Sequence, residues 1–322
     1  MENCIKGTIG RTESKDYYVL PLGGGETIRC SLRGKFKKDF HLKKDKLYLT
    51  DIAVVGDFVE FEINNDGTGV ISKIEERKNY LSRKAIKTRG SSYRGERLEQ
   101  IVASNIDNLF VISSVTKPPF NNKVIDRLIV TAESSKINVV IILNKIDLDV
   151  DGIEQKWLNL YSQIGYKILS TSKITGEGIV ELKNLLYGKK NLFWGQSGVG
   201  KSSLLNKLFP GINLITGDIS TYTDKGKHTT VTSLMLKMDD NTYIIDTPGI
   251  REIDPYGVKK EDLGHYFLEF SEYIKDCKFN TCTHNHEPGC AIIKAVEENK
   301  ISLERYESYM RILETIEDDI NF

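Results

Sequence analysis

The sequence lacks any apolar run that approaches the ~18–20 residues a membrane-spanning helix needs. It also lacks the apolar core of a signal peptide near its start, which reads Met1-Glu2-Asn3-Cys4-Ile5-Lys6. Cysteine is scarce, and three of the five cysteines lie close together near the end of the chain, an arrangement that suits a metal site in a reducing compartment better than disulfides. We therefore expect a cytosolic protein with no membrane association.

Net charge is also absent, because 45 Lys and Arg residues balance 45 Asp and Glu residues. The charges are unevenly distributed, however. Residues 1–97 hold 20 basic and 14 acidic side chains, a net of +6, and the remainder holds 25 and 31, a net of −6. A length of 322 residues is enough for two or three domains, and the composition is that of an ordinary globular protein.

A glycine-rich segment at 195–202 fits the phosphate-binding pattern G-x-x-x-x-G-K-[ST]. It lies between a predicted strand at 191–194 and a predicted helix at 202–208, which is the context that a P-loop requires. The backbone N–H groups and the helix dipole favour phosphate, and Lys201 is expected to reach the β- and γ-phosphates as a catalytic residue. A chance glycine-rich turn is the alternative. The expected nucleotide contacts here are Gly195, Gln196, Ser197, Gly198, Val199, Gly200, Lys201, Ser202 and Ser203.

Two further segments predict which nucleotide binds. Asn144, Lys145 and Asp147 form the guanine-recognition pattern N-K-x-D after the apolar run 139–143. A carboxylate at Asp147 accepts two hydrogen bonds from guanine, whereas adenine offers no such pair of donors. A second guanine-contacting loop is expected at the end of the next strand, with Thr171, Ser172 and Lys173. Together with the P-loop, these loops predict a site for GTP and GDP.

The remaining parts of the predicted site are a magnesium ligand and two switches. Asp246 follows the predicted strand 242–245 and, with the Ser202 hydroxyl and Thr230, is expected to hold Mg²⁺. Gly249 is placed to contact the γ-phosphate. The loop from Gly211 to about Lys227 is the expected first switch, ending in Thr229 and Thr230, although both threonines could instead only cap or pair the next strand.

Ile250 occupies the position where familiar GTPases have a water-orienting Gln. Slow hydrolysis in the isolated protein is therefore expected, unless another group supplies this function. His228 is the candidate, since an imidazole with a pKa near ~6.5 can accept or relay a proton. A surface histidine without catalytic function is the alternative.

The order of these motifs is unusual, because the guanine motif precedes the P-loop in the chain. Parallel sheets bind ligands at the carboxyl ends of their strands in whatever order the chain visits them. A site can therefore survive when old termini are joined and new ones are opened in a loop. The sequence predicts a circularly permuted α/β GTPase domain at residues 98–256.

The N-terminal part, residues 1–76, is predicted to be a small β-barrel of the OB-fold type, with strands at 4–8, 17–20, 27–32, 58–63 and 69–74. A lysine cluster between the third and fourth strands consists of Lys35, Lys37, Lys38, Lys43, Lys44 and Lys46. Residues 77–97 form a basic linker with interleaved Tyr80 and Tyr93, a composition that favours RNA contact. A barrel without a nucleic-acid role and a plain solvated linker are the alternatives.

The tail, residues 257–322, is predicted to be a mostly helical zinc-binding domain. Cys277, Cys282, His284 and Cys290 supply three thiolates and one imidazole for a closed tetrahedral zinc site, with His286 as an alternative ligand. Helices are expected at 291–298 and 302–318. In the second helix, the apolar stripe of Leu303, Tyr306, Met310, Leu313 and Ile316 is expected to pack in the core.

Taken together, these segments make the chain resemble the ribosome small-subunit-dependent GTPase A family (RsgA, also called YjeQ) over essentially its whole length. The resemblance is carried by the motif order, by the segment 225–230 (KGKHTT), by Asp-Thr-Pro-Gly at 246–249 and by the Cys/His cluster ending at Cys290. Asn79, Leu81 and Arg83, with Glu99 and Gln100, are similar to the family's linker. The resemblance implies late maturation of the small ribosomal subunit, GTP hydrolysis stimulated by that subunit, zinc at the four cluster residues and a proposed catalytic role for His228.

The leading hypothesis is thus a multi-domain GTPase, with an OB-fold, a permuted P-loop domain and a zinc domain, that binds the small subunit and its rRNA. A nucleotide-stabilised RNA-binding module is the first alternative, and a GTPase that acts on another structured RNA is the second. No DNA partner is expected. The absence of heptads or of an obvious dimer helix makes a monomer the expected state.

Overall fold

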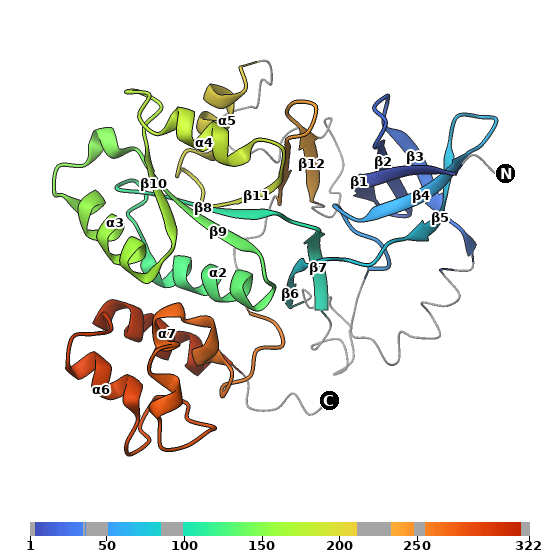
Figure 1. Cartoon of the computed structure of the whole chain (residues 1–322). Helices are drawn as coiled ribbons and strands as arrows, with labels where there is room; N and C mark the ends of the chain where they lie inside the picture. Colours follow the sequence, from blue (N-terminus) through green and yellow to red (C-terminus); the bar gives the residue numbers. More distant parts are fainter. Residues whose placement is uncertain are drawn as a thin grey trace, which may run out of the picture. The chain divides into compact units, whose positions relative to one another are not determined.

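A computed structural model describes residues 4–34, 36, 51–84, 99–210, 233–247 and 255–316. Its helices and strands are labelled in Figure 1, and its contacts define two compact units. The first unit comprises residues within 1–109, 183–194 and 201–252, and the second comprises residues within 110–182, 195–200 and 253–322. Among the helices of this described part, none is long and apolar enough to cross a membrane.

A five-stranded barrel opens the first unit. Its strands pair in the order β1-β2-β3-β5-β4, and pairing between β1 and β4 closes the ring. Strands β3 and β5 are parallel, while the other pairs in the barrel are antiparallel. This arrangement confirms the predicted barrel. The strand bounds are Ile5–Glu13, Asp16–Pro21, Ile28–Leu32, Phe58–Ile63 and Gly69–Ile74 for β1 to β5.

Alternating side chains build the barrel's core. In β4, Val59 and Phe61 point inward and are almost fully buried, whereas the intervening Glu60 points outward and is only partly buried. They pack with Ile9, Val19 and Ile71 in one hydrophobic cluster. The turn between β4 and β5 contains Gly67, whose φ of 82° is a conformation that glycine adopts without steric cost. The period of two therefore sets which face is buried.

The rest of the first unit supplies a hairpin and part of the α/β core. The hairpin pairs β6 (Tyr80–Lys84) with β7 (Glu99–Ser104), so the segment predicted as a linker contains a strand. Strand β13 (Tyr243–Asp246) lies between β11 (Lys190–Trp194) and β12 (Leu234–Lys237). Helix α5 (Lys201–Leu208) follows the glycine-rich segment.

The second unit contains three strands in the order β10-β9-β8, with helices in the connections. The bounds are Asn108–Ser114 for β8, Asn122–Ser134 for α2, Asn138–Asn144 for β9, Ile153–Ile164 for α3, Lys167–Thr171 for β10 and Ile179–Leu186 for α4. Strand β8 begins in the first unit and α4 ends there. Strand β9 is buried from its second residue to its end, as expected of a strand covered on both faces.

The C-terminal segment is helical, as predicted. Short 3₁₀ turns at Leu263–Tyr266, Leu268–Phe270 and Ile274–Asp276 precede α6 (Ala291–Glu297) and α7 (Leu303–Thr315). Their buried side chains share a cluster that includes Phe267, Phe270 and Tyr309, and α2 contributes Val130 to it. Helix α7 packs directly on α2.

The predicted stripe of α7 is wrong at one end. Leu303 is 58 % exposed, whereas Arg305 is fully buried together with Tyr309 and Ile312. Arg305 turns inward because Asp126 of α2 receives a hydrogen bond from its Nη1, and Glu269 Oε1 lies 2.6 Å from its Nε. The Tyr161 hydroxyl donates to the same Asp126 oxygen at 2.7 Å. Two carboxylates thus offset the cost of burying the guanidinium.

Replacing Arg305 with Met should destabilise the protein by about 3–5 kcal/mol, because Asp126 and Glu269 would lose their buried cation. Arg311→Met on the exposed side of the same helix is the control and should change stability by less than about 0.5 kcal/mol. Urea unfolding followed by tryptophan fluorescence measures both variants. Equal losses of stability in the two variants would show that the buried charge cluster does not stabilise the fold more than an exposed arginine does.

Candidate functional site

The two predicted guanine loops leave the sheet side by side. Strands β9 and β10 are parallel, and their last residues, Asn144 and Thr171, are direct partners in the register. The chain turns at Lys145, which has a left-handed φ of 61°, and then enters the 3₁₀ turn Ile146–Leu148. Asp147 is exposed on this turn and accepts a hydrogen bond from the buried Ser172 hydroxyl. The two loops therefore present their polar groups at one edge.

Side chains of the guanine motif also hold the glycine-rich segment. The Asn144 amide donates to the Val199 carbonyl at 2.8 Å and accepts from the Thr171 hydroxyl at 3.0 Å. Lys145 Nζ donates to the carbonyls of Gly198 at 2.6 Å and of Lys117 at 2.5 Å. Burial, and then the nearby charge of Lys173, lowers the pKa of Lys145. The structure thus brings together the predicted guanine and phosphate loops, although they lie far apart in the sequence.

Gly200 is the residue of the glycine-rich segment where the backbone passes close to the side chain of Asn144. A Cβ atom at this position would lie 2.4 Å from Asn144 Nδ2. The φ of Gly200 is 102°, a backbone conformation that residues with a side chain rarely adopt. Gly200→Ala should lower kcat/KM for GTP by about 10–100-fold, because the Asn144 bridge must move. Gly165 is a matched control, since it has a φ of 108° and nothing within 4 Å of its ideal Cβ. Steady-state kinetics of both variants checks this, and a similar loss in Gly165→Ala would attribute the effect to backbone strain alone.

The P-loop strand and Asp246 are aligned in the same way within the first unit. Strands β11 and β13 are parallel, with Phe193 opposite Asp246, and Gly195 follows the last residue of β11. Asp246 is buried to 5 % exposure at the carboxyl end of its strand. Lys201, Ser202 and Ser203 form the first turn of α5. Their roles as P-loop and magnesium-binding residues stay predictions.

Several predicted residues lie outside the described part of the chain. They are the first switch (211–227), His228, Thr229, Thr230, Gly249, Ile250, the lysine cluster at 35–46 and the linker from 85 to 98. Their roles therefore stay predictions.

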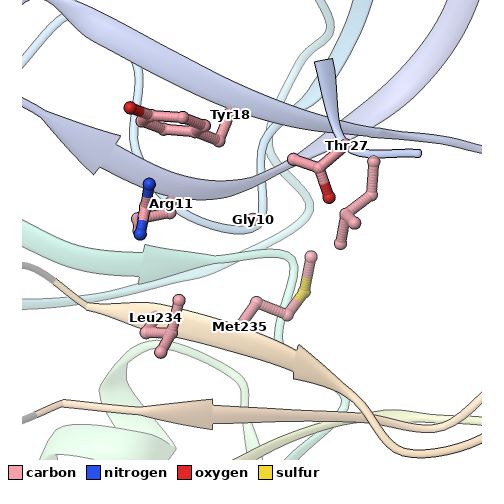
Figure 2. Close-up of a pocket in the computed structure, with 7 residues that line it drawn as sticks. Gly10, Arg11, Tyr18, Thr27, Leu234 and Met235 are labelled. Carbon is pink, nitrogen blue, oxygen red and sulfur yellow. The ribbon is translucent and has the colours of Figure 1, made fainter. Parts of the chain in front are cut away.

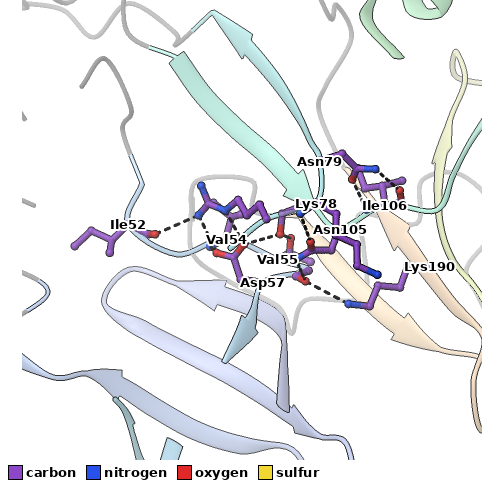
Figure 3. A network of polar contacts seen from close by, with 12 residues as sticks. Ile52, Val54, Val55, Asp57, Lys78, Asn79, Asn105, Ile106 and Lys190 are labelled. Atoms are coloured by element: carbon purple, nitrogen blue, oxygen red, sulfur yellow. Dashed lines mark hydrogen bonds and ion pairs between the residues drawn. The ribbon is translucent and has the colours of Figure 1, made fainter. Parts of the chain in front are cut away.

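A buried polar network, which no sequence motif predicts, connects the barrel to the strand that leads into the P-loop (Figure 3). Asp57 is fully buried and receives both Nε of Arg77 at 2.7 Å and Nη2 at 2.8 Å. The Ser104 hydroxyl on β7 donates to the same carboxylate at 2.6 Å. Lys190, the first residue of β11, donates to the Gly56 carbonyl at 3.3 Å, and its Nζ lies 3.6 Å from the centre of the Phe58 ring.

Burial lowers the pKa of Lys190 to about 8, from an ordinary value of 10.5, and the charge of Asp107 only partly offsets this effect. The folded-state pKa lies below that of the unfolded chain, so keeping Lys190 charged costs stability in full below pH 8. That cost is relieved as the pH rises toward 10.5. The unmodified protein should therefore gain about 2–3 kcal/mol of stability between pH 8 and pH 10.5, and Lys190→Met should lack this gain. Urea unfolding at each pH measures the free energy of unfolding of both proteins. Lys189→Met, an exposed neighbour, should keep the gain, and identical profiles for both variants would contradict the assignment.

The predicted metal ligands come together at the start of α6. The ligand atoms of Cys277, Cys282, His284 and Cys290 all lie within 4.8 Å of one another. His284 Nδ1 is 3.6 Å from the Cys277 sulfur and 3.4 Å from the Cys290 sulfur. A tetrahedral site with metal–sulfur bonds of about 2.3 Å requires sulfur separations of about 3.8 Å, so the residues fit such an ion. The cluster contains His284 rather than the alternative, His286.

Neighbouring groups fix the loop that carries these ligands. Glu287 accepts hydrogen bonds from the Thr283 amide at 2.7 Å and the Asn285 amide at 3.0 Å. Burial alone would raise the pKa of Glu287, but these and further hydrogen bonds hold it at about 2. The hydroxyls of Tyr306 and Tyr309 donate to the carbonyls of His284 and Thr283, each at 2.7 Å. The loop is therefore shaped by α7 and by its own carboxylate.

The glycine-rich segment, the two loops with guanine-type motifs and Asp246 each lie at the carboxyl end of a strand, which is typical of a P-loop GTPase, here with permuted motif order. A small barrel precedes it and a Cys/His-bearing helical segment follows. A family model described as RsgA GTPase matches residues 74–256, and one described as RsgA N-terminal domain matches residues 6–71. The chain belongs to the RsgA GTPase family.

Relatives match over nearly the whole chain. "Small ribosomal subunit biogenesis GTPase RsgA" of Phocaeicola vulgatus is 41% identical and covers 94% of both chains. The protein of the same name from Chlorobaculum tepidum is 39% identical over 98% of this chain and 99% of the relative.

Solved structures give the same result. YjeQ from Thermotoga maritima matches with a TM-score of 0.75 and 34% identity, covering 97% of this chain and 98% of that chain. YloQ, described as a circularly permuted GTPase, matches with a TM-score of 0.71 and 26% identity, covering 98% of this chain and 96% of that chain.

Proposed function

We propose that this protein is a GTP hydrolase that binds the small ribosomal subunit, assists its late maturation and is released when the subunit stimulates hydrolysis. The observation that carries the GTPase part is the bridge from Asn144 to Thr171 and to Val199, which joins both guanine loops to the phosphate loop. The names of the full-length relatives supply the subunit as the partner.

Each predicted residue has a role in this proposal. Asp147 accepts hydrogen bonds from guanine, with Asn144, Lys145 and the loop of Thr171, Ser172 and Lys173 holding the base. The backbone of 195–200 binds the phosphates, and Lys201 neutralises the charge that develops on them. Ser203 completes the first turn of α5. Mg²⁺ held by Ser202, Thr230 and Asp246 would neutralise the β- and γ-phosphate oxygens.

Slow turnover alone follows from the side chain at position 250. An isoleucine cannot orient water, so a second group must do so. We assign this to His228, with Thr229, Thr230 and Gly249 responding to the γ-phosphate. The subunit would accelerate hydrolysis by ordering this segment, and loss of the γ-phosphate would relax it.

Zinc is the ion proposed for Cys277, Cys282, His284 and Cys290. Three thiolates and an imidazole leave no open coordination position, so the ion is structural. The segments proposed to bind rRNA are the barrel (1–76), the basic linker (77–97) and the zinc domain (257–322). The GTPase domain (98–256) would control release from the subunit through GTP hydrolysis. We further propose a cytosolic monomer without a DNA partner.

Cosedimentation with purified small subunits tests the proposal. A GTP analogue should increase the affinity at least about tenfold over GDP, because coupling between two ligands is reciprocal. Equal affinity with analogue, GDP and no nucleotide would favour the alternative of a nucleotide-stabilised RNA-binding module. Stronger competition by another structured RNA would favour a GTPase that acts on that RNA.

A further inference from the structure

A hollow of about 280 Å³ lies in the first unit between the outer face of the barrel and strand β12 (Figure 2). Its walls come from β1 and β2, from the residue before β3 and from β12. Sites for drug-sized ligands usually measure about 300–1,000 Å³, so this one suits a single small planar group. None of the residues assigned to the nucleotide or the metal lines it.

One end of the hollow is a cationic stacking platform. The Arg11 guanidinium carbon lies 4.0 Å from the centre of the Tyr18 ring. Glu13 holds both side chains, since it accepts from the Tyr18 hydroxyl at 3.1 Å and lies 3.5 Å from Arg11 Nε. The Arg11 side chain remains 36% exposed. Guanidinium planes and tyrosine rings are the surfaces on which unpaired RNA bases stack.

The other end is apolar with a hydroxyl at its rim. Leu20 and Met235 line it, and Met235 is only 4% exposed although it borders the hollow. Thr27 is exposed and also lines the hollow (Figure 2). A phosphate group would gain nothing from these apolar walls, and an aliphatic side chain would gain nothing from the guanidinium. A nucleobase has flat faces for stacking and polar edges for Arg11 and Thr27, so it uses both ends.

We propose that this hollow binds one unpaired RNA base, stacked against the Tyr18–Arg11 pair with β12 as the opposite wall. The inference rests on the proposed function, which supplies rRNA as the source of the base. Basic residues exceed acidic ones by six in residues 1–97, which attracts the RNA backbone to this part of the chain.

Because of the position of β12, a bound base would affect the GTPase domain. Leu234 begins β12 shortly after Thr230 and is paired with Arg11 of the barrel. The preceding Ser233 hydroxyl donates to the Val102 carbonyl at 2.7 Å and fixes the start of the strand. A base held between Arg11 and Met235 would brace the strand that follows the first switch. RNA contact would thereby reach the catalytic segment through the backbone.

The full-length protein is titrated with a short fluorescent oligouridine that contains one 4-thiouridine, and binding is followed by anisotropy at low salt. Tyr18→Leu removes the ring, and Thr27→Trp fills the hollow. Both should weaken binding about tenfold, the value of one stacked base. Tyr187→Leu, the same change at a tyrosine 67% exposed elsewhere in the unit, is the control. Thermal unfolding and GTP hydrolysis by the isolated protein should be unchanged in all three variants.

Photocrosslinking of the same complexes locates the base. Crosslinks should map to residues that line the hollow and disappear in Thr27→Trp. The proposal is overturned if the unmodified protein does not bind oligouridine, if both variants bind as it does, or if all crosslinks lie elsewhere. Crosslinking of the hollow to a ribosomal protein in subunit complexes would also overturn it. Failure to cosediment with small subunits, with oligouridine results as expected, would instead refute the proposed function.

Discussion

Asp147→Asn should exchange the nucleotide preference of this protein from GTP to xanthosine triphosphate. The carboxylate of Asp147 can accept from N1–H and from the exocyclic amine of guanine. An amide keeps one acceptor but turns its other group into a donor, which faces the guanine amine unfavourably. Hydrogen bonds to charged groups are each worth about 1.5–3 kcal/mol, so GTP affinity should fall by about 10²–10⁴-fold. Xanthine has a carbonyl in place of the amine and should recover most of that loss.

Competition of both nucleotides for a fluorescent analogue measures the exchange. Asp149→Asn is the matched control, because Asp149 lies two residues further on and accepts from the backbone of Ile153 at 3.1 Å and Glu154 at 2.8 Å. An amide oxygen can keep part of this cap, so nucleotide preference should not change. Loss of GTP binding without any gain for xanthosine triphosphate would show that Asp147 supports the loop rather than reads the base.

Cys282→Ser should release the metal and unfold the C-terminal segment. Structural zinc contributes an apparent ~10–16 kcal/mol in small zinc domains, and the cluster loop supports the core that contains Phe270 and Tyr309. We expect zinc content to fall from about one ion per chain to near zero. Cleavage by protease within 255–316 should become rapid, while the barrel remains resistant.

Cys4→Ser is the control, since Cys4 is exposed and lies outside the metal cluster. It should retain zinc and resist protease as the unmodified protein does. Elemental analysis and limited proteolysis followed by mass spectrometry measure both quantities. Full zinc content in Cys282→Ser would contradict the assigned ligand set.

Local patterns predicted most elements of this fold. Helix α3 shows what its own sequence can specify, because Trp157 and Tyr161 mark its buried face and Gly165 ends it with a φ of 108°. The loop with the N-K-x-D motif could be placed at a strand end because the motif follows the apolar run 139–143. Three cysteines and a histidine close together in sequence likewise specified the metal cluster. In each case the signal lies within a few residues of the feature.

Features that depend on distant partners could not be predicted. Arg305 resembles a solvent-exposed helical residue until Asp126 and Glu269 are placed beside it. Because Arg305 is charged and Leu303 is apolar, the sequence pattern favours Leu303 as the core residue. Lys190 likewise gives no hint of burial, because its contact with Gly56 joins segments far apart in the chain. The strand β6 was missed because its alternation is masked by basic residues, and its partner β7 lies beyond the linker.

GTP hydrolysis by the purified protein, with small subunits, with large subunits and alone, tests the central claim most directly. We predict slow turnover alone and with large subunits, and an increase of about 100-fold or more with small subunits, since a partner must complete a site that has Ile250 where a water-orienting Gln is expected. A rate that stays slow with every particle would contradict subunit-stimulated hydrolysis, leave the GTP site intact and favour the RNA-binding module.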